Sequence, residues 1–564
     1  MWLIWLGAGG SAAFILSYFL PSTFINEPTV ARAIFGSEWL HLFLCLQAAY
    51  LIARDESWQM SSSAREWAWP LGVGVVAAVI IQGAVEWKFR VLADETNLVG
   101  SSMSLYTDRL YQNVLEGYFY YDQFHPVTTV LDKRPGLYPF LMYLLHCLFG
   151  YDAYHGFVVN GIAAALSAML VFRIGNRMGG HPTGAFAVLT LVGLPIFALG
   201  ATSSGYEVLN QLLLLATFWQ LVRFLELTTP ARLQLLLLTG LAAAEVRYES
   251  ILVLLPIGAA ACYRFRILSA GKSIYALAVT PLLTVPLHWQ RTVTTALNEG
   301  DSEATKIFDL AHWSENVKHL GEYLFDPHFV GYPIAPIISV LAIIGAVILA
   351  HKLFRNTDRK PRVVALLTAG ALILIVSVQL AYYRGDPRQP AAQRIAIGYS
   401  GTLALLAALA LSRWAAVPKL GGLSWALAIF LCLDGMSRAA ADEQGNQLLI
   451  ARQYKTSCEF LQTQPRAGTL LIADRPGLFV VHRYGAISGQ RLHSETESII
   501  AAMSNKLLTN VLIEQRIYLD ESQPPSPAIP TGFSSEPLYE FQNDARYRVR
   551  ISRLSPGEDA ALLE

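Results

Sequence analysis

The chain has 564 residues, of which 54% are hydrophobic and only 15% are charged, and its mean hydropathy is +0.39. A soluble fold cannot bury so large an apolar share, so these values exclude an ordinary soluble protein and predict a polytopic α-helical membrane protein. Lys plus Arg and Asp plus Glu balance at 42 each, so no net charge favours nucleic acid as a partner.

Apolar blocks long enough to cross a bilayer recur along most of the chain. We expect about 13 transmembrane helices, two of them short, near residues 2–20, 37–53, 69–89, 153–174, 183–201, 207–226, 233–246, 249–264, 273–290, 333–351, 363–383, 394–413 and 421–437. Lys and Arg gather in short loops, such as HKLFRNTDRKPR (351–362), and short basic loops mark the cytoplasmic side. The long loop 92–150 is therefore expected on the outer, extracytoplasmic face.

Two stretches of this loop are expected to lie at the membrane surface. The segment Pro135–Gly150 is apolar but too short to span, which favours an interfacial or re-entrant helix. The tyrosine-rich stretch 105–124 has partly helical spacing, and tyrosine prefers the headgroup level of a membrane.

The composition changes after the last apolar block. We predict a transmembrane domain over residues 1–437, including the loop 92–150, and a small extracytoplasmic soluble α/β domain over 438–564. Strand-like runs in the second part are TLLIAD, FVVH, NVLIE and RYRVRIS. Asp474 ends the run TLLIAD and His482 ends the run FVVH, and turn formation after a strand explains the aspartate better than catalysis does.

The order of several motifs resembles the GT-C membrane glycosyltransferases, and in particular the protein O-mannosyltransferases and the lipid A aminoarabinose transferases. An apolar block ends before Asp94 and Glu95, and DKRPGLYPFLMYLLHCLFGYD (132–152) follows the loop. TSSGYEVLNQLLLL (202–215) and AAAEVRYESILVLLP (242–256) continue the likeness, which runs from about Leu92 to Pro256. The resemblance implies a bacterial inner membrane enzyme with an extracytoplasmic active site. The first two apolar blocks precede the helix that is usually the first in such proteins, so the resemblance does not explain the role of residues 1–60.

Such enzymes transfer a sugar from a polyprenyl-phosphate carrier to an acceptor hydroxyl, and that reaction needs a base beside the hydroxyl. We expect Asp94 to be this base, with Glu95 and Glu207 as further catalytic acids. Asp94 and Glu95 could instead cap a helix. Glu207 could serve only as a carboxylate at a helix N-terminus.

The departing lipid phosphate needs positive charge, and arginine binds phosphate oxygens two at a time. The candidates for substrate binding are Lys133, Arg134, Tyr138, Arg247, Tyr248, Arg384, Arg388 and Arg394. Arg247 is the most informative, because it lies between two short apolar blocks; an ion pair with Glu245 or Glu249 explains it equally well.

The partners expected are the polyprenyl-phosphate sugar donor, membrane lipids and a lipid, glycan or protein acceptor. No cofactor is assigned: the acids offer oxygen ligands to a divalent cation, but their spacing selects no metal. Two other functions stay open, a lipid or small-molecule transporter and a polysaccharide polymerase or ligase. Matched halves, which many transporters have, are not found in the sequence.

Overall fold

The structure is a computed structural model that describes residues 26–55, 60–120, 123–264, 280–298, 308–329, 331, 334–355, 359–383, 385–442, 445–520 and 523–557. The chain forms two compact units. The first unit comprises residues 1–87, 133–141 and 156–442, and the second comprises 88–132, 142–155 and 443–564. The predicted first span, 2–20, lies outside the described residues.

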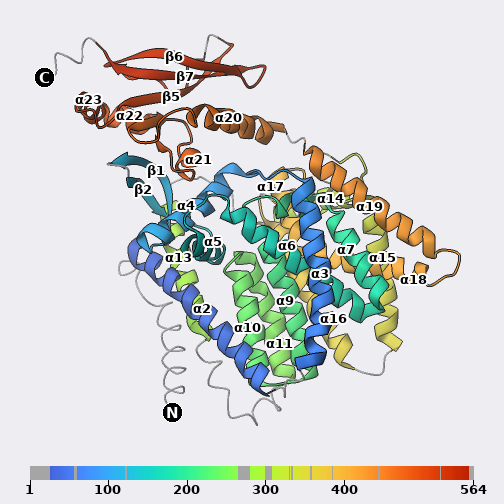
Figure 1. Cartoon of the computed structure of the whole chain (residues 1–564). Coiled ribbons are helices and arrows are strands. Elements are labelled where there is room, and N and C mark those ends of the chain that lie inside the picture. The colour runs from blue at the N-terminus through green and yellow to red at the C-terminus, as the bar shows by residue number, and fades with distance from the viewer. Residues whose placement is uncertain are drawn as a thin grey trace, which may run out of the picture. The chain divides into compact units, whose positions relative to one another are not determined.

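The first unit is helical (Figure 1). Its elements are α2 (Glu27–Asp55), α3 (Met60–Ala84), the start of α5 (Leu137–Phe149), α6 (His155–Gly179), α7 (His181–Val192), α8 (Pro195–Ala201), α9 (Glu207–Glu226), α10 (Pro230–Ala244), η2 (Tyr248–Val253), α11 (Leu254–Tyr263), α13 (Thr284–Asn298), α14 (Leu310–Phe325), α15 (Pro336–Arg355), α16 (Arg359–Ala381), α17 (Pro390–Gln393), η4 (Arg394–Ala396), α18 (Ile397–Ala415) and α19 (Gly421–Ala441).

Eight helices among the described residues are long and apolar enough to cross a membrane. A ninth span is possible if α7 and α8 count as one, although they meet at an angle of 74°. The predicted span 183–201 is thus broken, because Pro195 begins α8 and cannot continue the hydrogen bonding of α7. The two short blocks appear as α10 and as η2 with α11. Of the block 273–290, residues 280–290 are described and lead into α13, whereas 273–279 lie outside the described residues.

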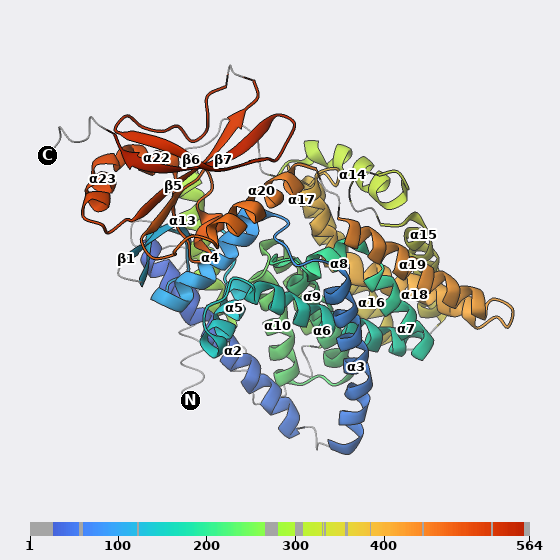
Figure 2. The same ribbon diagram turned by 45° about the horizontal axis from the view of Figure 1, so that its top comes forward.

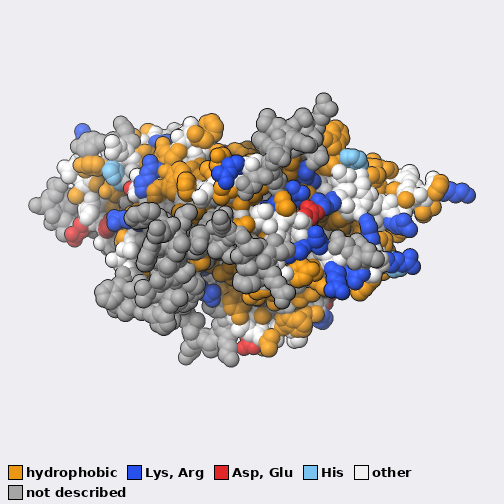
Figure 3. Space-filling model, turned by 90° about the horizontal axis from the view of Figure 1, so that it is seen from below, with side chains coloured by type: hydrophobic (Ala, Val, Ile, Leu, Met, Phe, Trp, Pro, Cys, Tyr) orange, Lys and Arg blue, Asp and Glu red, His pale blue; other side chains and the backbone are white. Residues whose placement is uncertain are grey.

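Large apolar side chains are exposed on the surface of the helical unit, and their exposure to water would be unfavourable. Val347 on α15 and Ile373 on α16 are each 65% exposed, and Leu366 on α16 is 72% exposed. Figure 3 shows hydrophobic side chains beside Lys and Arg on one face of the molecule. Close helix packing depends on small residues: a Cβ added at Gly345 of α15 would meet the Leu406 carbonyl oxygen of α18 at 1.8 Å.

The second unit contains α4 (Leu92–Asp108), β1 (Gln112–Tyr120), β2 (Gln123–Leu131), the end of α5, α20 (Gly445–Leu461), β3 (Thr469–Ile472), α21 (Gly477–Val480), β4 (Gly485–Ile487), α22 (Gly489–Ser494), α23 (Thr496–Ser504), β5 (Asn510–Tyr518), β6 (Phe533–Gln542) and β7 (Tyr547–Pro556). The strands form one sheet in the order β2-β1-β4-β3-β5-β7-β6. Strands β3, β4 and β5 are parallel, and Figure 2 shows β5, β6 and β7 side by side.

The two faces of β5 have different neighbours, as the two-residue period of a strand requires. Val511 and Ile513 belong to a hydrophobic core with Leu492 and Ile499 of α22 and α23. Glu514 has the opposite orientation and accepts hydrogen bonds from residues of α20.

The loop and the C-terminal region share this sheet, although we expected the loop 92–150 within the membrane domain. The tyrosine-rich stretch begins in α4, which contains Tyr106, and its residues 112–120 form strand β1. Strand β1 pairs with β2, and Gly117 pairs with Ala486 of β4. The expectation of a helical surface segment is therefore wrong over 112–120, where the aromatic residues Tyr118, Phe119 and Tyr120 favour a strand. Residues 88–132 and 142–155 consequently group with 443–564.

Three of the four predicted strand runs are strands, namely those within β3, β5 and β7. The run FVVH is not a strand, because Pro476 and Gly477 start the short helix α21 there. The short apolar segment after Pro135 forms the 13-residue helix α5, which is too short to span a bilayer.

Candidate active site

Four residues that the sequence singled out come together around one buried tyrosine. Tyr206 immediately precedes α9, and burial raises the pKa of its hydroxyl. Arg247, Arg394 and Arg134 lie close enough to oppose this rise in the pKa of Tyr206, whereas Glu207 adds to it. We call Arg134, Tyr206, Glu207, Arg247 and Arg394, with Glu249, the arginine cluster. All six belong to the helical unit.

Glu207 is the first residue of α9, and its side chain is only 6% exposed. Its Oε1 lies 3.3 Å from Nε of Arg394, which is the first residue of η4. Gly205 lies beside it, and a Cβ at this position would meet Oε2 of Glu207 at 2.4 Å, so a side chain there would displace the carboxylate. Burying a charged group is costly unless it is paired, and Arg394 provides the cationic partner of Glu207.

Arg247 binds Glu249 through a two-point contact. Its Nη2 donates to Oε1 at 3.2 Å, and its Nε donates to Oε2 at 3.4 Å. The Arg247 side chain is 11% exposed, and its guanidinium lies 5.7 Å from the centre of the Tyr206 ring. The ion pair with Glu249 is thus present, and the same guanidinium also faces the ring of Tyr206.

The backbone around the cluster is held by hydrogen bonds between distant segments. Gln290 of α13 donates to the Arg134 carbonyl oxygen at 2.6 Å. The Leu137 N–H donates to the carbonyl oxygen of Glu245, which follows α10 and precedes Arg247 by two residues. The amide of Asn160 on α6 donates to the carbonyl oxygen of Gly205 at 2.6 Å, which fixes the turn before α9.

Other predicted substrate-binding residues lie differently. Tyr138 is fully buried, and its hydroxyl donates to the Gly156 carbonyl oxygen at 3.0 Å. Lys133 is exposed, and Tyr248 is half-buried. Arg388 is exposed and forms ion pairs with Asp386 and Glu315, so its guanidinium is engaged by carboxylates at the protein surface. Arg384 lies outside the described residues.

Asp94 and Glu95 lie in the first turn of α4, in the second unit. Glu95 is 2% exposed, and its Oε1 accepts the N–H groups of Val91 at 3.0 Å and Arg90 at 3.2 Å. Glu95 therefore satisfies backbone donors at the helix start, as the capping interpretation requires. Asp94 is half-buried.

Tyr206 and Gln290 are the members of this arrangement that the sequence did not single out. The only sequence signal for Tyr206 is its place next to Glu207, and Gln290 has no signal beyond a polar side chain in an apolar block. Within the part of the chain that the structure describes, no group of three or more His, Cys, Asp or Glu residues is placed to hold a metal ion.

Comparisons with known proteins concern the family resemblance and the fold. A family model described as dolichyl-phosphate-mannose-protein mannosyltransferase matches residues 133–289, a segment that contains Arg134, Glu207 and Arg247. No curated protein matches the chain in sequence.

Three solved structures are similar. ArnT from Cupriavidus metallidurans bound to undecaprenyl phosphate has 12% identity and a TM-score of 0.51, covering 86% of this chain and 98% of that chain. Its apo structure has 12% identity and a TM-score of 0.50, covering 87% and 98%. Arabinosyltransferase EmbB from Mycobacterium smegmatis has 13% identity and a TM-score of 0.37, covering 87% and 49%. Together with the helices and the matched segment, the similarity to ArnT confirms that this chain has the GT-C fold of membrane glycosyltransferases.

Proposed function

We propose that this protein transfers a sugar from a polyprenyl-phosphate donor to a hydroxyl group on the outer side of the membrane. The observation that carries this proposal is the arginine cluster. Arg134, Arg247 and Arg394 gather around Tyr206 in a buried setting, and Glu207 and Glu249 pair with Arg394 and Arg247. Such a setting favours the binding of an anion such as a phosphate, because guanidinium groups are strongest where water is excluded. The ArnT structure with undecaprenyl phosphate supports a lipid phosphate as that anion.

The cluster can stabilise the leaving group in the transfer step. The acceptor oxygen forms a bond to the anomeric carbon while the bond from that carbon to the phosphate oxygen breaks. The electron pair of the broken bond remains on the lipid phosphate, where Arg247 is the arginine that we propose as its main contact. Positive charge that meets developing negative charge lowers the barrier of such a step.

The acceptor proton needs a base, and we propose Asp94. Glu95 already accepts two backbone N–H groups, whereas Asp94 is half-buried on the neighbouring position of the helix. Adjacent helical residues point in different directions, so the two acids have different tasks. We further propose that Glu207 orients Arg394, which its ion pair supports.

The proposal also names a class of sugar and a class of acceptor. We propose a hexosyl or pentosyl donor and an acceptor that is a glycolipid, a lipopolysaccharide, another glycan or a protein. The exposed apolar side chains and the basic loop 351–362 support a multi-pass protein of the bacterial inner membrane with its active site on the outer side.

The test is incubation of the purified protein with a panel of polyprenyl-phosphate sugars and acceptors, followed by mass spectrometry of the acceptors. We expect an acceptor that gains the mass of one sugar. A transporter would instead carry its substrate across a vesicle membrane without forming a new glycosidic bond. Transport without any glycosylated acceptor across the panel would reject the proposal.

A further inference from the structure

Helix α2 packs against segments that hold the arginine cluster, although the family resemblance does not explain its role. Figure 1 and Figure 2 both show α2 beside α10. Leu44 and Ala48 of α2 share a hydrophobic core with Leu238 of α10. The helix also packs against α13, which carries Gln290, the donor to the Arg134 carbonyl oxygen. All of these residues belong to the helical unit.

The same helix contacts α5 through aromatic rings. Phe140 of α5 is 1% exposed, and its ring centre lies 5.2 Å from that of Trp39 and 6.5 Å from that of Phe35, both in edge-on geometry. Phe140 follows Arg134 by six residues. Helix α2 therefore contacts the segment that carries Arg134 as well as the helix that leads to Arg247.

One histidine makes the polar contact between α2 and the end of α10. Nδ1 of His41 is hydrogen-bonded to Oε2 of Glu245, and Nε2 donates to the Leu238 carbonyl oxygen at 2.9 Å. A carbonyl oxygen can only accept, which places a proton on Nε2 and leaves Nδ1 for the carboxylate. His41 and Glu245 are 3% and 4% exposed, so little water competes for this contact.

Glu245 connects His41 to the arginine cluster. Its carbonyl oxygen accepts the N–H of Leu137 at 3.1 Å, at the start of α5. Arg247 lies two residues further along, and its N–H donates to the Ala243 carbonyl oxygen at 2.9 Å. The side chain of Glu245 thus ties the turn between α10 and η2 to α2, and this turn determines where the Arg247 side chain starts.

A second buried acid lies one helical turn before His41. Glu38 is 3% exposed and interacts electrostatically with both Glu245 and His41. Its Oε2 is buried and has no hydrogen-bond partner in the part of the chain that the structure describes. Because carboxylates repel each other, the imidazole near both acids favours the present position of Glu245, and its loss would favour a shift of Glu245 away from α2.

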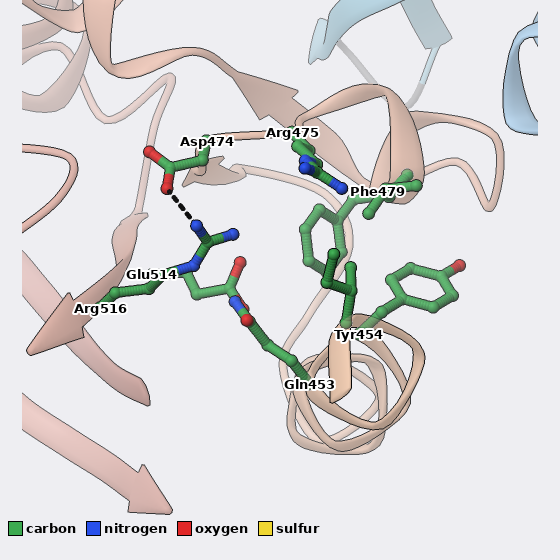
Figure 4. A pocket seen from close by; sticks show the side chains of 9 residues that line it. Gln453, Tyr454, Asp474, Arg475, Phe479, Glu514 and Arg516 are labelled. Carbon is green, nitrogen blue, oxygen red and sulfur yellow. Dashed lines mark hydrogen bonds and ion pairs between the residues drawn. The ribbon is translucent and has the colours of Figure 1, made fainter. Parts of the chain in front are cut away.

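The second unit has a buried carboxylate whose hydrogen bonds stay within that unit. Glu514 of β5 accepts from Gln453 Nε2 at 2.9 Å and from Ser457 Oγ at 2.7 Å, both on α20. Figure 4 shows Gln453 and Glu514 near the ion pair of Asp474 with Arg516. The cavity among these side chains, of about 20 Å³, has room for about one water molecule. Ser457 thus makes a buried hydrogen bond that does not serve the arginine cluster.

We propose that His41 is a positioning residue for the lipid phosphate of the donor. By holding the Glu245 carboxylate, it holds the turn 245–247 where the Arg247 guanidinium can meet the phosphate oxygens. This role rests on the proposed sugar transfer and gives α2 a part in donor binding. His41 acts through Arg247 rather than on the substrates, so its effect concerns the donor and not the acceptor.

Two variants that each keep one hydrogen bond test this role. The amide of asparagine lies at the position of Nδ1, so His41→Asn can still donate to Glu245. The longer glutamine places its amide near the position of Nε2, so His41→Gln keeps only the bond to the Leu238 carbonyl oxygen. We expect His41→Gln to raise the KM for the polyprenyl-phosphate sugar about tenfold, and His41→Asn to raise it by less than about threefold. The KM for the acceptor should stay unchanged in both.

Ser457→Ala is the matched control, because it also removes a buried hydrogen bond but should leave both KM values unchanged. All assays are run below the unfolding midpoint of the least stable variant. Binding of polyprenyl phosphate to the purified full-length protein gives the same comparison without turnover, and its Kd should follow the same order.

The possible outcomes separate this role from the proposed function. Wild-type protein that glycosylates no acceptor would reject the proposed function and the role of His41 with it. In an active protein, any other order of the two His41 variants, equality included, would overturn the role of His41 alone. The same would follow if the acceptor KM rose with the donor KM, or if Ser457→Ala raised the donor KM as much as His41→Gln does.

Discussion

Glu207 and Arg394 form a buried ion pair, with Oε1 of the first 3.3 Å from Nε of the second. The pair joins the start of α9 to the start of η4, which leads into α18. Both residues stood out in the sequence for separate reasons, one as an acid at the start of an apolar block and the other as an arginine of an outer loop. Their contact makes them parts of one arrangement.

Removing one member of this pair is expected to destabilise the protein. Glu207→Gln leaves the Arg394 guanidinium in a buried place without its carboxylate, which costs on the order of 3 kcal/mol in buried pairs. Thermal unfolding in detergent measures the effect. The double variant Glu207→Gln with Arg394→Gln should lose less than the sum of the single losses, and strictly additive losses would show that the pair has no coupling.

Arg247 is expected to affect use of the lipid donor through its fork of N–H groups. Arg247→Ala should weaken donor use more than Arg247→Lys, because lysine keeps the charge but cannot bind two phosphate oxygens at once. Transfer rates at varied donor concentration measure this, with Arg413→Ala as a control at an exposed arginine. Identical donor kinetics for wild type and both Arg247 variants would remove Arg247 from the site.

The sequence could predict that the chain is mostly apolar helices and which charged residues lie beside them, because both depend on local composition; the sequence predicts about 13 spans, and eight or nine qualify among the described residues. Arg134, Glu207, Arg247 and Arg394 are charged residues next to apolar blocks, where charge is costly. The sequence could not predict that these residues gather around Tyr206, because their proximity depends on how the helices pack. The pairing of Gly117 with Ala486 could not be predicted either, because no local sequence pattern specifies which distant strand pairs with β1.

The Asp94 prediction separates catalysis from helix capping. If Asp94 removes the acceptor proton, Asp94→Asn should lower turnover by about 10²–10⁴-fold with normal folding, since asparagine keeps the size but loses the base. Glu95→Gln should act mainly on stability, because Glu95 bonds to backbone N–H groups. Asp108→Asn, at the exposed end of the same helix, is the control. Asn caps helices about as well as Asp, so wild-type turnover in Asp94→Asn would leave only the capping role.

His41 on α2 and Glu245 after α10 form a second buried contact, between Nδ1 and Oε2. The other ring nitrogen, Nε2, donates to the Leu238 carbonyl oxygen at 2.9 Å. His41→Ala leaves the Glu245 carboxylate without this partner and is expected to destabilise the protein by about 3 kcal/mol. The thermal unfolding midpoint measures this, and His328→Ala, at an exposed histidine, should leave it unchanged. No difference between the two variants would mean that the contact contributes nothing.

His482 is expected to make stability depend on pH. Burial lowers the pKa of His482 to about 4, from about 6.5 in the unfolded chain. The unfolded state therefore binds the proton first as the pH falls below 6.5, and the folded state loses stability down to about pH 4. The loss between pH 7 and pH 5 is about 2 kcal/mol for such a shift.

His482→Phe should reduce this loss, because phenylalanine does not titrate. His493→Phe, at an exposed histidine, should keep the wild-type dependence. Unfolding midpoints at a series of pH values provide the measurement. Parallel pH profiles for wild type and His482→Phe would show that His482 is not the titrating group.

The most direct test of the proposed sugar transfer is the mass balance of one reaction. Purified protein would be given a polyprenyl-phosphate sugar and an acceptor, and both the released lipid phosphate and the glycosylated acceptor would be quantified by mass spectrometry over time. The proposed mechanism predicts one lipid phosphate for each sugar that reaches the acceptor, with both products lost together in Arg247→Ala. Lipid phosphate that forms without a glycosylated acceptor, or an intact donor under conditions where the protein is folded and binds it, would contradict the proposed transfer.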